Sequence, residues 1–243
     1  MKFISYFTFF TLLIFPVFSE DEFADLLSED LEEEPIPEIA DPLEPMNKVF
    51  FAVNEYGFKF ILKPIAIVYN FLTPRIVQRG IDNSIYNFHS PIPIANSLFQ
   101  ANLGDAGKET SRLLINSTIG LAGFIDVADP LLGYKRTNRD ADQTLGKAGF
   151  GWGIYGHPPL YGPGSIREAF GVGADTFFKP TTYIFWSAGV VSLYYTLGIY
   201  AVKNFNSIAM NLELYDNLYR DSFDPYAYVK SAYIQNNLKK TER

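Results

Sequence analysis

Gly151, Gly153 and Gly156 match the G-x-G-x-x-G pattern with which some proteins bind the phosphates of a dinucleotide. That chemistry needs a strand before the motif and a helix after it, so that the pyrophosphate meets a helix N-terminus. Here His157-Pro158-Pro159 follows the last glycine, and proline prevents a regular helix at that point. We therefore exclude a dinucleotide site.

The same glycines belong to a longer glycine-rich segment, residues 143–166, which carries a single charge, Lys147. Nine of the 18 glycines of the chain lie between positions 146 and 173, and aromatic residues alternate with them. Glycine lets the backbone approach a ligand or another backbone closely. The segment is too rich in glycine for a packed helix and too apolar for a solvated loop. It therefore predicts an irregular surface that meets an apolar partner.

Polar residues at helical spacing form a second group of candidates. Arg79, Asn83 and Asn87 recur every four residues, and Arg112 precedes Asn116 by the same interval. Residues four apart lie on one face of a helix. One interpretation, the commoner role of buried polar groups, is hydrogen bonding between helices. The other is a polar lining for a channel that accepts lipid head groups, and the spacing alone leaves both open.

No arrangement typical of catalysis or of metal binding is found. The chain lacks the G-x-S-x-G turn of serine hydrolases, and it contains no cysteine. Its two histidines, His89 and His157, are isolated from other ligand types at metal spacing. The carboxylates Asp126 and Asp129 are interpreted as capping and solvated groups. We expect no catalytic residue, no metal and no cofactor, and an exported hydrolase acting on lipid remains a third alternative.

The N-terminus predicts export. Residues 1–19 have one early lysine and an apolar run that ends at Val17-Phe18-Ser19, as in a secretory signal peptide, and a buried helix or membrane anchor is the alternative. Residues 20–44 hold 12 of the 27 acidic residues and no base, which predicts a disordered acidic tether. Residues 45–243 form a single predicted domain with 15 acids and 19 bases. Such a weakly basic body suits an anionic lipid surface, whereas its scattered bases give no support to nucleic-acid binding.

The elements that must position the candidate residues read as helices. Asp41, Thr73, Ser90 and Asp224 each precede a proline, the pattern of a capping residue before the first helical position, and Asp105 is a further predicted cap. Helices are predicted over 46–63, 74–88, 105–118 and 225–240, and the first is amphipathic, with Met46, Val49 and Val53 on one side. Alternating strand patterns are hard to find, so the predicted class is all-α.

Residues 180–202 lie between Lys179 and Lys203 and carry no charge. As one helix they would reach about 30 Å, the hydrocarbon width of a bilayer. Serine, threonine, tyrosine and glycine dilute the stretch, so three interpretations stay open: a single-pass anchor, a helix partly in lipid and partly against its own protein, and a buried pair of core helices.

Several stretches taken together, in their order and spacing over about residues 41–235, resemble the MlaA family, also called VacJ. The residues that carry the resemblance are Asp41-Pro42-Leu43-Glu44-Pro45-Met46-Asn47-Lys48, Val77-Gln78-Arg79-Gly80 with Asn83, Asn87 and Pro91, Arg112 to Asn116 with Gly120, Gly123, Phe124, Asp126 and Ala128, Gln143-Thr144-Leu145-Gly146, Tyr161-Gly162-Pro163 with Ser165 and Arg167, and Ser222 to Tyr226 with Tyr233.

The resemblance implies an all-α ring, or doughnut, of amphipathic helices embedded in a leaflet of the Gram-negative outer membrane and facing the periplasm. It implies non-enzymatic transport that removes misplaced phospholipids from the outer leaflet and so maintains lipid asymmetry. The implied partners are phospholipids, a trimeric porin and a soluble periplasmic lipid carrier. On this view the lipid-binding residues are Arg79, Asn83, Asn87, Arg112, Asn116 and Arg167, and the pore-lining residues are Gly146, Gly149, Gly151, Gly153 and Gly156.

One departure from the family concerns its N-terminal lipid. Family members are typically lipoproteins with an N-terminal cysteine, and this chain has no cysteine, so we expect it not to be lipidated there and to be anchored by its helices. Lys48 and Lys230 also stand where arginine is commoner, which keeps the charge and loses the bidentate fork. The alternative function is a peripheral periplasmic scaffold, bound to the outer membrane or a porin, without a conducting channel.

Overall fold

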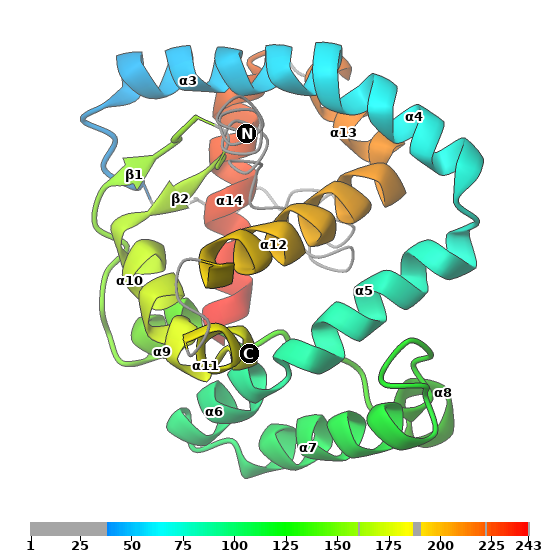
Figure 1. The fold of residues 1–243 in the computed structure, drawn as a ribbon. Helices are drawn as coiled ribbons and strands as arrows, with labels where there is room; N and C mark the ends of the chain where they lie inside the picture. Colours follow the sequence, from blue (N-terminus) through cyan, green and yellow to red (C-terminus); the bar gives the residue numbers. More distant parts are fainter. Residues whose placement is uncertain (1–37, 160, 187–190, 222, 243) are drawn as a thin grey trace. The chain divides into compact units, whose positions relative to one another are not determined.

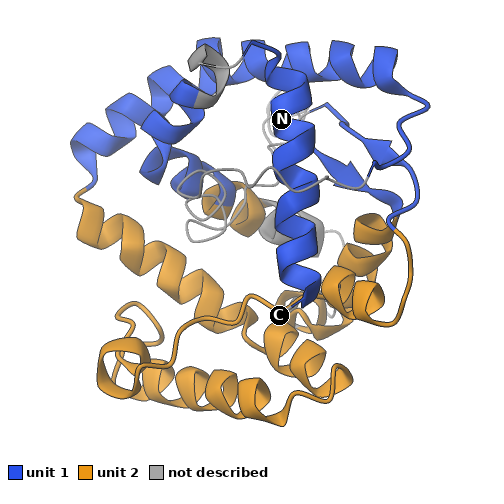
Figure 2. Ribbon diagram, turned by 180° about the vertical axis from the view of Figure 1, so that it is seen from behind, with its two compact units in different colours: residues 1–73, 152–166, 204–243 blue, residues 74–151, 167–203 orange. Residues whose placement is uncertain are grey.

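The computed structural model describes residues 38–159, 161–186, 191–221 and 223–242, and it divides into two compact units (Figure 2). Unit 1 comprises the chain up to residue 73, residues 152–166 and the chain from residue 204 onward, and unit 2 comprises residues 74–151 and 167–203. The predicted signal peptide and most of the predicted tether lie outside the described residues.

Unit 1 begins with a long helical run, α3 (Glu44–Gly57), the π-helical turn η1 (Phe58–Leu62) and α4 (Lys63–Leu72) (Figure 1). Pro64 lies in the first turn of α4, directly after the π turn. Because proline cannot donate the bond to the residue four positions earlier, the hydrogen-bond register changes there without ending the helical run. The predicted helix over 46–63 is therefore part of a longer one.

Strands β1 (Tyr155–Gly156) and β2 (Gly164–Ser165) pair antiparallel in unit 1, and α13 (Leu212–Asp221) and α14 (Pro225–Glu242) follow in the chain. The hydrophobic core of the unit joins the segment before α3, α3 itself, β1 and α14. Its buried members are Ile39, Phe51, Tyr155, Tyr226, Val229, Ala232, Tyr233 and Ile234. A second cluster holds Phe58, Leu62 and Ile208.

Unit 2 contains the helices that carry most of the candidate residues. They are α5 (Arg75–His89), α6 (Pro91–Phe99), α7 (Leu103–Thr118), α8 (Ala128–Leu132), α9 (Ala141–Lys147), α10 (Ile166–Asp175), the 3-10 turn η2 (Thr176–Phe178) and α11 (Pro180–Trp186). Helix α7 packs against α6, α5 and α8. The helix α12 (Val191–Met210) begins in unit 2 and ends in unit 1.

The described residues confirm the all-α class, since β1 and β2 form their only sheet. The ring arrangement and the membrane embedding stay predictions. No single helix among the described residues is long and apolar enough to be a candidate membrane span. The bent pair Glu44–Leu72 and Arg75–His89 is a candidate by length and composition only. The uncharged stretch 180–202 holds two helices, α11 and α12, and residues 187–190 between them lie outside the described part.

Most of the predicted proline caps are wrong in detail. Asp224 does cap α14, with its Oδ1 3.1 Å from the amide of Ala227. No side-chain cap bond exists at the starts of α3, α5 or α6. Helix α7 is capped by Asn102 rather than Asp105, because the helix starts two residues earlier than its apolar pattern suggests.

The residues before α3 belong to unit 1 rather than to a detached tether. Ile39 is buried in the unit 1 core, and the amide of Tyr155 donates to the carbonyl of Ala40 at 2.9 Å. The side chain of Asp41 is also buried, in contact with α14. The acidic tether therefore stays a prediction for the residues before Glu38 only.

Candidate functional site

All six predicted lipid-binding residues lie in unit 2, and four of them stand on α5 or α7 facing the chain that links α7 to α9. Asn83 donates to the carbonyl of Phe124 at 3.3 Å and accepts from Arg136 at 2.6 Å. Asn87 donates to the hydroxyl of Ser117 at 2.9 Å. These two amides therefore connect helices and loops within the unit.

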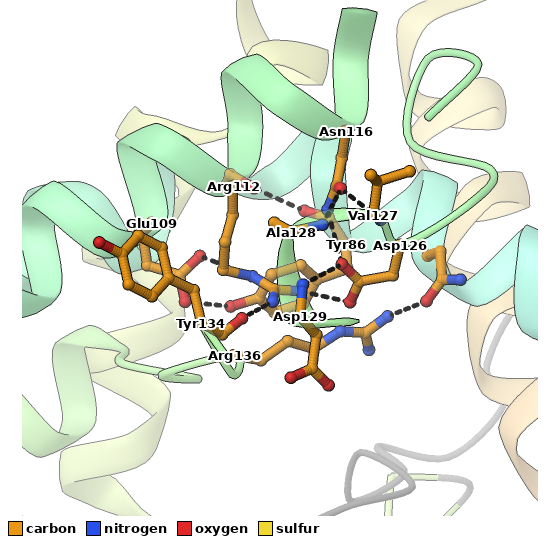
Figure 3. A network of polar contacts seen from close by, with 12 residues as sticks. Tyr86, Glu109, Arg112, Asn116, Asp126, Val127, Ala128, Asp129, Tyr134 and Arg136 are labelled. Atoms are coloured by element: carbon orange, nitrogen blue, oxygen red, sulfur yellow. Dashed lines mark hydrogen bonds and ion pairs between the residues drawn. The ribbon is translucent and has the colours of Figure 1, made fainter. Parts of the chain in front are cut away.

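Arg112 occupies the centre of the polar network in Figure 3. Its side chain is buried, and its guanidinium donates to Asp126 Oδ2 at 2.6 Å and to the carbonyl of Tyr134. Glu109, on the preceding turn of α7, accepts from the Tyr86 hydroxyl at 2.8 Å and from the amide of Thr137 at 2.6 Å. The network thus holds the 119–140 chain against α5 and α7.

The side-chain amide of Asn116 forms three hydrogen bonds in the same network. It donates to Asp126 Oδ1 at 3.0 Å, and its oxygen accepts from the amides of Val127 and Ala128 at 2.8 and 3.0 Å (Figure 3). One asparagine therefore supplies the cap that starts α8. Of the two interpretations of this residue, hydrogen bonding between elements therefore agrees with the contacts of Asn116 in this structure.

The electrostatics of the network favour its ionised form. Burial alone raises the pKa of Asp126, but the hydrogen bonds from Arg112 and Asn116 outweigh that cost and hold the pKa below its ordinary value. Arg136 adds a second cation, which pairs with Asp82 at 2.6 Å and lies 4.3 Å from the centre of the Tyr86 ring. A half-buried carboxylate with such partners is an anchor for a loop, because its charge is already compensated within the protein.

Arg167 forms a separate buried ion pair. Its guanidinium grips Asp142 through two bonds, of 2.7 and 3.1 Å, and donates to the carbonyl of Phe150 at 3.1 Å. This fork-to-fork geometry links α10, α9 and the beginning of the irregular glycine-rich stretch. Asn96 on α6 adds links to two other helices, because it donates to Asp175 of α10 at 2.8 Å and accepts from the hydroxyl of Thr144 of α9 at 2.8 Å.

Arg79 differs from the other two arginines. It lies exposed on α5, and it has no hydrogen bond or ion pair to any residue in the described part of the chain. The neighbouring Gly80 packs against the outer end of the Phe124 ring, so close that an added Cβ would lie 2.2 Å from Cζ of the ring. Arg79 is therefore the one predicted lipid-binding arginine whose guanidinium remains available to a ligand.

The glycine-rich segment is helical at one end and irregular in its middle. Gly146 lies inside α9, which corrects the prediction that no helix enters this segment. Gly149 and Gly153 have φ of +89° and +74°, the left-handed region that favours glycine, and Gly149, Gly151 and Gly153 are exposed. Gly156 lies in β1. The predicted pore-lining glycines are divided between unit 2 (Gly146, Gly149 and Gly151) and unit 1 (Gly153 and Gly156).

The part of the glycine-rich segment that lies in unit 1 is held in place by Asp41, which the sequence predicted only as a helix cap. Asp41 accepts from Tyr226 at 2.6 Å, from Lys230 at 2.9 Å and from Asn47 at 2.8 Å. Asn47 in turn accepts from the amide of His157 at 2.9 Å. Two of the sequence motifs shared with the MlaA family, the one that begins at Asp41 and the one that ends at Tyr226, are therefore in contact and hold the chain around β1.

Residues 39–240 match the model of a protein family described as the MlaA lipoprotein. The chain belongs to this family. Among its relatives is the intermembrane phospholipid transport system lipoprotein MlaA of Escherichia coli K12, which is 29% identical over 202 residues, covering 82% of this chain and 77% of that protein. The MlaA protein of Haemophilus influenzae is 29% identical over 203 residues, covering 83% and 79%.

A solved structure gives the same result for the fold. It comes from work on the structural basis for maintenance of bacterial outer membrane lipid asymmetry, and its chain superposes with a TM-score of 0.72 at 30% sequence identity. The superposition covers 83% of the present chain and 99% of the other. The family is described as lipoproteins, and none of the 243 residues of this chain is a cysteine that could take a thioether-linked lipid.

This MlaA-family chain distributes its polar and apolar residues in an unusual way. Among the residues whose exposure the structure describes, 23 polar or charged residues are buried against 17 hydrophobic ones. In water-soluble proteins hydrophobic residues dominate the buried class. The reversal is clearest on α3, whose buried residues are Asn47, Phe51 and Asn54, while the apolar side with Met46, Val49 and Val53 is exposed.

The same exposure continues along η1 and α4. Between residues 49 and 72 the exposed large hydrophobic residues are Val49, Val53, Tyr56, Phe60, Ile61, Ile65, Ile67, Val68, Phe71 and Leu72, and Phe71 is 87% exposed. A contiguous apolar surface of this kind marks a contact with lipid or with another protein.

The sequence did not predict the carboxylates that pair with the buried arginines and asparagines of the site. The interpretation of Asp126 as a capping group agrees with its bond from the amide of Asp129 at 3.4 Å, in the first turn of α8, but its ion pair with Arg112 was not expected. Asp142, Asp105 and Asp175 also hold buried partners, and no spacing rule connects residues this far apart in the chain. Among the described residues, no group of three or more His, Cys, Asp and Glu side chains could hold a metal ion.

Proposed function

We propose that this chain removes phospholipid from the outer leaflet of the outer membrane and passes it toward the periplasm without a chemical step. The observation that carries the proposal is the reversed distribution of residues, with apolar side chains exposed and asparagines buried. In lipid an exposed apolar surface is favourable, and a buried polar interior can replace the hydration of a moving head group. Family membership and the named function of the E. coli relative support it.

The exposed apolar run over α3, η1 and α4 supports embedding in one leaflet, with the helices rather than a thioether lipid as the anchor. On this proposal the helices form a ring around an amphipathic channel. The partners are phospholipids, a trimeric porin that shares the outer membrane, and a soluble carrier that accepts lipid on the periplasmic side. Export by the N-terminal signal peptide brings the chain to that location.

Within the site we assign different roles to the three arginines. Arg79 is the head-group contact, because its exposed guanidinium can form charge-assisted bonds to a phosphate. Arg112 and Arg167 are positioning residues, since each of these buried guanidinium groups is paired with a carboxylate of unit 2. Asn83, Asn87 and Asn116 hold the elements around Arg79.

Reversing the charge of Arg79 tests this assignment. Arg79→Glu is expected to lower the rate of phospholipid removal about tenfold or more, since a charged hydrogen bond contributes about 1.5–3 kcal/mol. Arg79→Lys should retain part of the activity because it keeps the charge. The readout is outer-leaflet phosphatidylethanolamine, labelled with a membrane-impermeant amine reagent in cells that lack their own MlaA-family protein.

The matched control is Lys239→Glu, an equal charge reversal on the last turn of α14. Equal activity of Arg79→Glu, Lys239→Glu and the unchanged chain, at equal protein levels, would show that Arg79 does not contact the head group.

The glycine-rich segment is proposed to form a close backbone wall of the channel. Gly151 has open space where a Cβ would lie, whereas a Cβ on Gly153 would lie 3.1 Å from Ile166 at a φ of +74°. Gly151→Val is therefore expected to leave the unfolding midpoint unchanged and to reduce transport by narrowing the channel. Thermal unfolding and surface labelling measure the two effects, and normal transport by a stable Gly151→Val chain removes the wall from the proposal.

The alternative function is a peripheral scaffold on the outer membrane or a porin, without a channel. Carbonate or high salt releases a peripheral protein, whereas an embedded one needs detergent. Extraction of the chain by carbonate would favour the scaffold.

A further inference from the structure

The turn that connects α7 to α8 is seen in Figure 1. Three aliphatic side chains of this turn are exposed, those of Ile119, Leu121 and Ile125, and we call them the aliphatic tip. Leu121 is 68% exposed. Leu114 on α7 and Leu131 on α8 are also exposed and extend the same chemistry onto the two adjoining helices. None of these side chains can form a hydrogen bond, so water offers them no compensating interaction.

The backbone of the tip is strained where its most exposed side chain is attached. Leu121, Ala122 and Gly123 follow one another in the left-handed region, with φ of 53°, 56° and 89°. Glycine is needed at position 123, because a Cβ there would lie 2.4 Å from the Cβ of Asn87. Leucine at 121 is not needed for the turn, since glycine or asparagine adopts this conformation at lower cost. Strain kept at an exposed aliphatic residue indicates a function for that side chain.

The tip is also rigid and internally bonded. The amides of Ala122, Gly123 and Ile125 donate to the carbonyls of Ser117, Asn116 and Gly120, at 3.3, 2.7 and 2.9 Å. Below the tip, Asn83 holds the carbonyl of Phe124 and Phe124 packs on Gly80. Most amides of the tip therefore bond within unit 2, which lowers the cost of moving this turn into hydrocarbon below that of an ordinary solvated loop.

The charges around the tip suit a lipid surface. Arg79 is exposed one residue from Gly80, which touches Phe124, and Lys135 is exposed beyond α8. The carboxylate of Asp126 is turned inward onto Arg112. Exposed cations at the rim of an aliphatic surface match phosphate groups above acyl chains.

From this combination we infer that the aliphatic tip inserts into the acyl-chain layer of the membrane as a preformed wedge. This rests on the membrane location in the proposed function, and it adds a second lipid contact, in unit 2, to the exposed run of α3, η1 and α4. The tip needs no ordering on insertion, because its contacts within unit 2 already fix its conformation.

The absence of cysteine from the chain makes the test direct, because any introduced cysteine is a unique labelling site. Leu121→Cys, Phe71→Cys and Lys108→Cys are each labelled with an environment-sensitive fluorophore in the full chain, which is then reconstituted into vesicles of phosphatidylethanolamine and phosphatidylglycerol. Nitroxide groups on the lipid acyl chains act as quenchers. Phe71 reports on α4, and the charged, exposed Lys108 on α7 is the control expected outside the hydrocarbon.

The inference predicts strong quenching at positions 121 and 71 and weak quenching at 108. Quenching at 71 without quenching at 121 overturns the inserted tip and leaves the proposed embedding intact. Absence of quenching at both positions contradicts the embedding and the tip together. Equal quenching at 121 and 108 also overturns the inference, because it shows no preference for the tip.

A second variant separates insertion from folding. Leu121→Gly relieves the left-handed strain, so the unfolding midpoint of the chain should stay the same or rise. Its partition into the same vesicles should weaken about tenfold, because the aliphatic side chain is lost. Leu114→Ala, on the adjoining helix, is expected to have a smaller effect. Unchanged partition of Leu121→Gly would overturn the inference.

Discussion

Replacing Arg112 with methionine is expected to lower the free energy of unfolding of unit 2 by about 3–5 kcal/mol, the usual cost of removing one partner of a buried ion pair. The substitution keeps much of the side-chain volume and removes the cation that Asp126 and the neighbouring Glu109 face. The 119–140 chain would then lose its main attachment to α7. Urea unfolding in detergent, followed by circular dichroism, measures the change.

Arg79→Met is the matched control, since it removes an exposed arginine from α5 and should change stability by less than about 0.5 kcal/mol. Arg112→Met combined with Asp126→Asn should cost less than the sum of the two single changes, because the second change removes the unpaired charge. Equal unfolding midpoints for Arg112→Met and Arg79→Met would contradict the anchoring role of Arg112.

Acidification is expected to destabilise unit 1 by about 3 kcal/mol between pH 6.5 and pH 4, through His157. Burial lowers the pKa of His157 from 6.5 to about 4, with Asp41 opposing the shift only weakly. The folded state therefore resists a proton that the unfolded chain accepts, so stability falls as the pH drops through this window. The unfolding midpoint measured across the window gives the slope.

His157→Gln removes one of two such groups, because burial also lowers the pKa of His89 in unit 2 to about 4, so the slope between pH 6.5 and pH 4 should become shallower without disappearing. A second loss should remain at lower pH in both proteins. Burial raises the pKa of Asp41, but the bonds from Tyr226 and Lys230 outweigh it and hold the pKa below its usual value, so that stability is lost as Asp41 takes its proton. An equally steep slope in His157→Gln would assign the acid sensitivity to another group.

The helical class could be predicted from the sequence because it depends on local signals. Helices begin near the predicted prolines and carry the residues spaced by four, but most of the predicted cap bonds are not formed. Asp41, for example, does not cap α3 and instead accepts from Tyr226 and Lys230 of α14. That contact joins residues 185 or more positions apart, and no local rule predicts it.

The candidate site was predicted in part. Arg112 and Asn116 lie in one network as their spacing suggests, but their partners come from the irregular chain after α7, where the sequence shows no period. The periodicity of the sequence also could not predict which face of α3 is exposed. A helical pattern shows that Val49 and Val53 share a face, and it cannot show that this face is exposed while Asn47 and Asn54 are buried.

The physical picture that results is a rigid polar interior with an apolar exterior. Buried ion pairs such as Arg112–Asp126 and Arg167–Asp142 add little net stability when compared with hydrophobic packing. In this chain such ion pairs attach irregular backbone, including the aliphatic tip and the glycine-rich segment, to the neighbouring helices. Few buried hydrophobic residues are available there to do so. Fixed irregular backbone is what a lipid-facing surface or a channel wall requires.

Outer-leaflet phospholipid in living cells is the decisive measurement for the proposed transport. A Gram-negative strain without its own MlaA-family protein is complemented with this chain, and surface phosphatidylethanolamine is labelled with the impermeant amine reagent. If the chain removes outer-leaflet phospholipid, the label falls to the level of the parent strain, while the Arg79→Glu chain leaves it high. Unchanged surface phosphatidylethanolamine, with the unaltered chain present at normal levels in the outer membrane, would contradict the proposed transport.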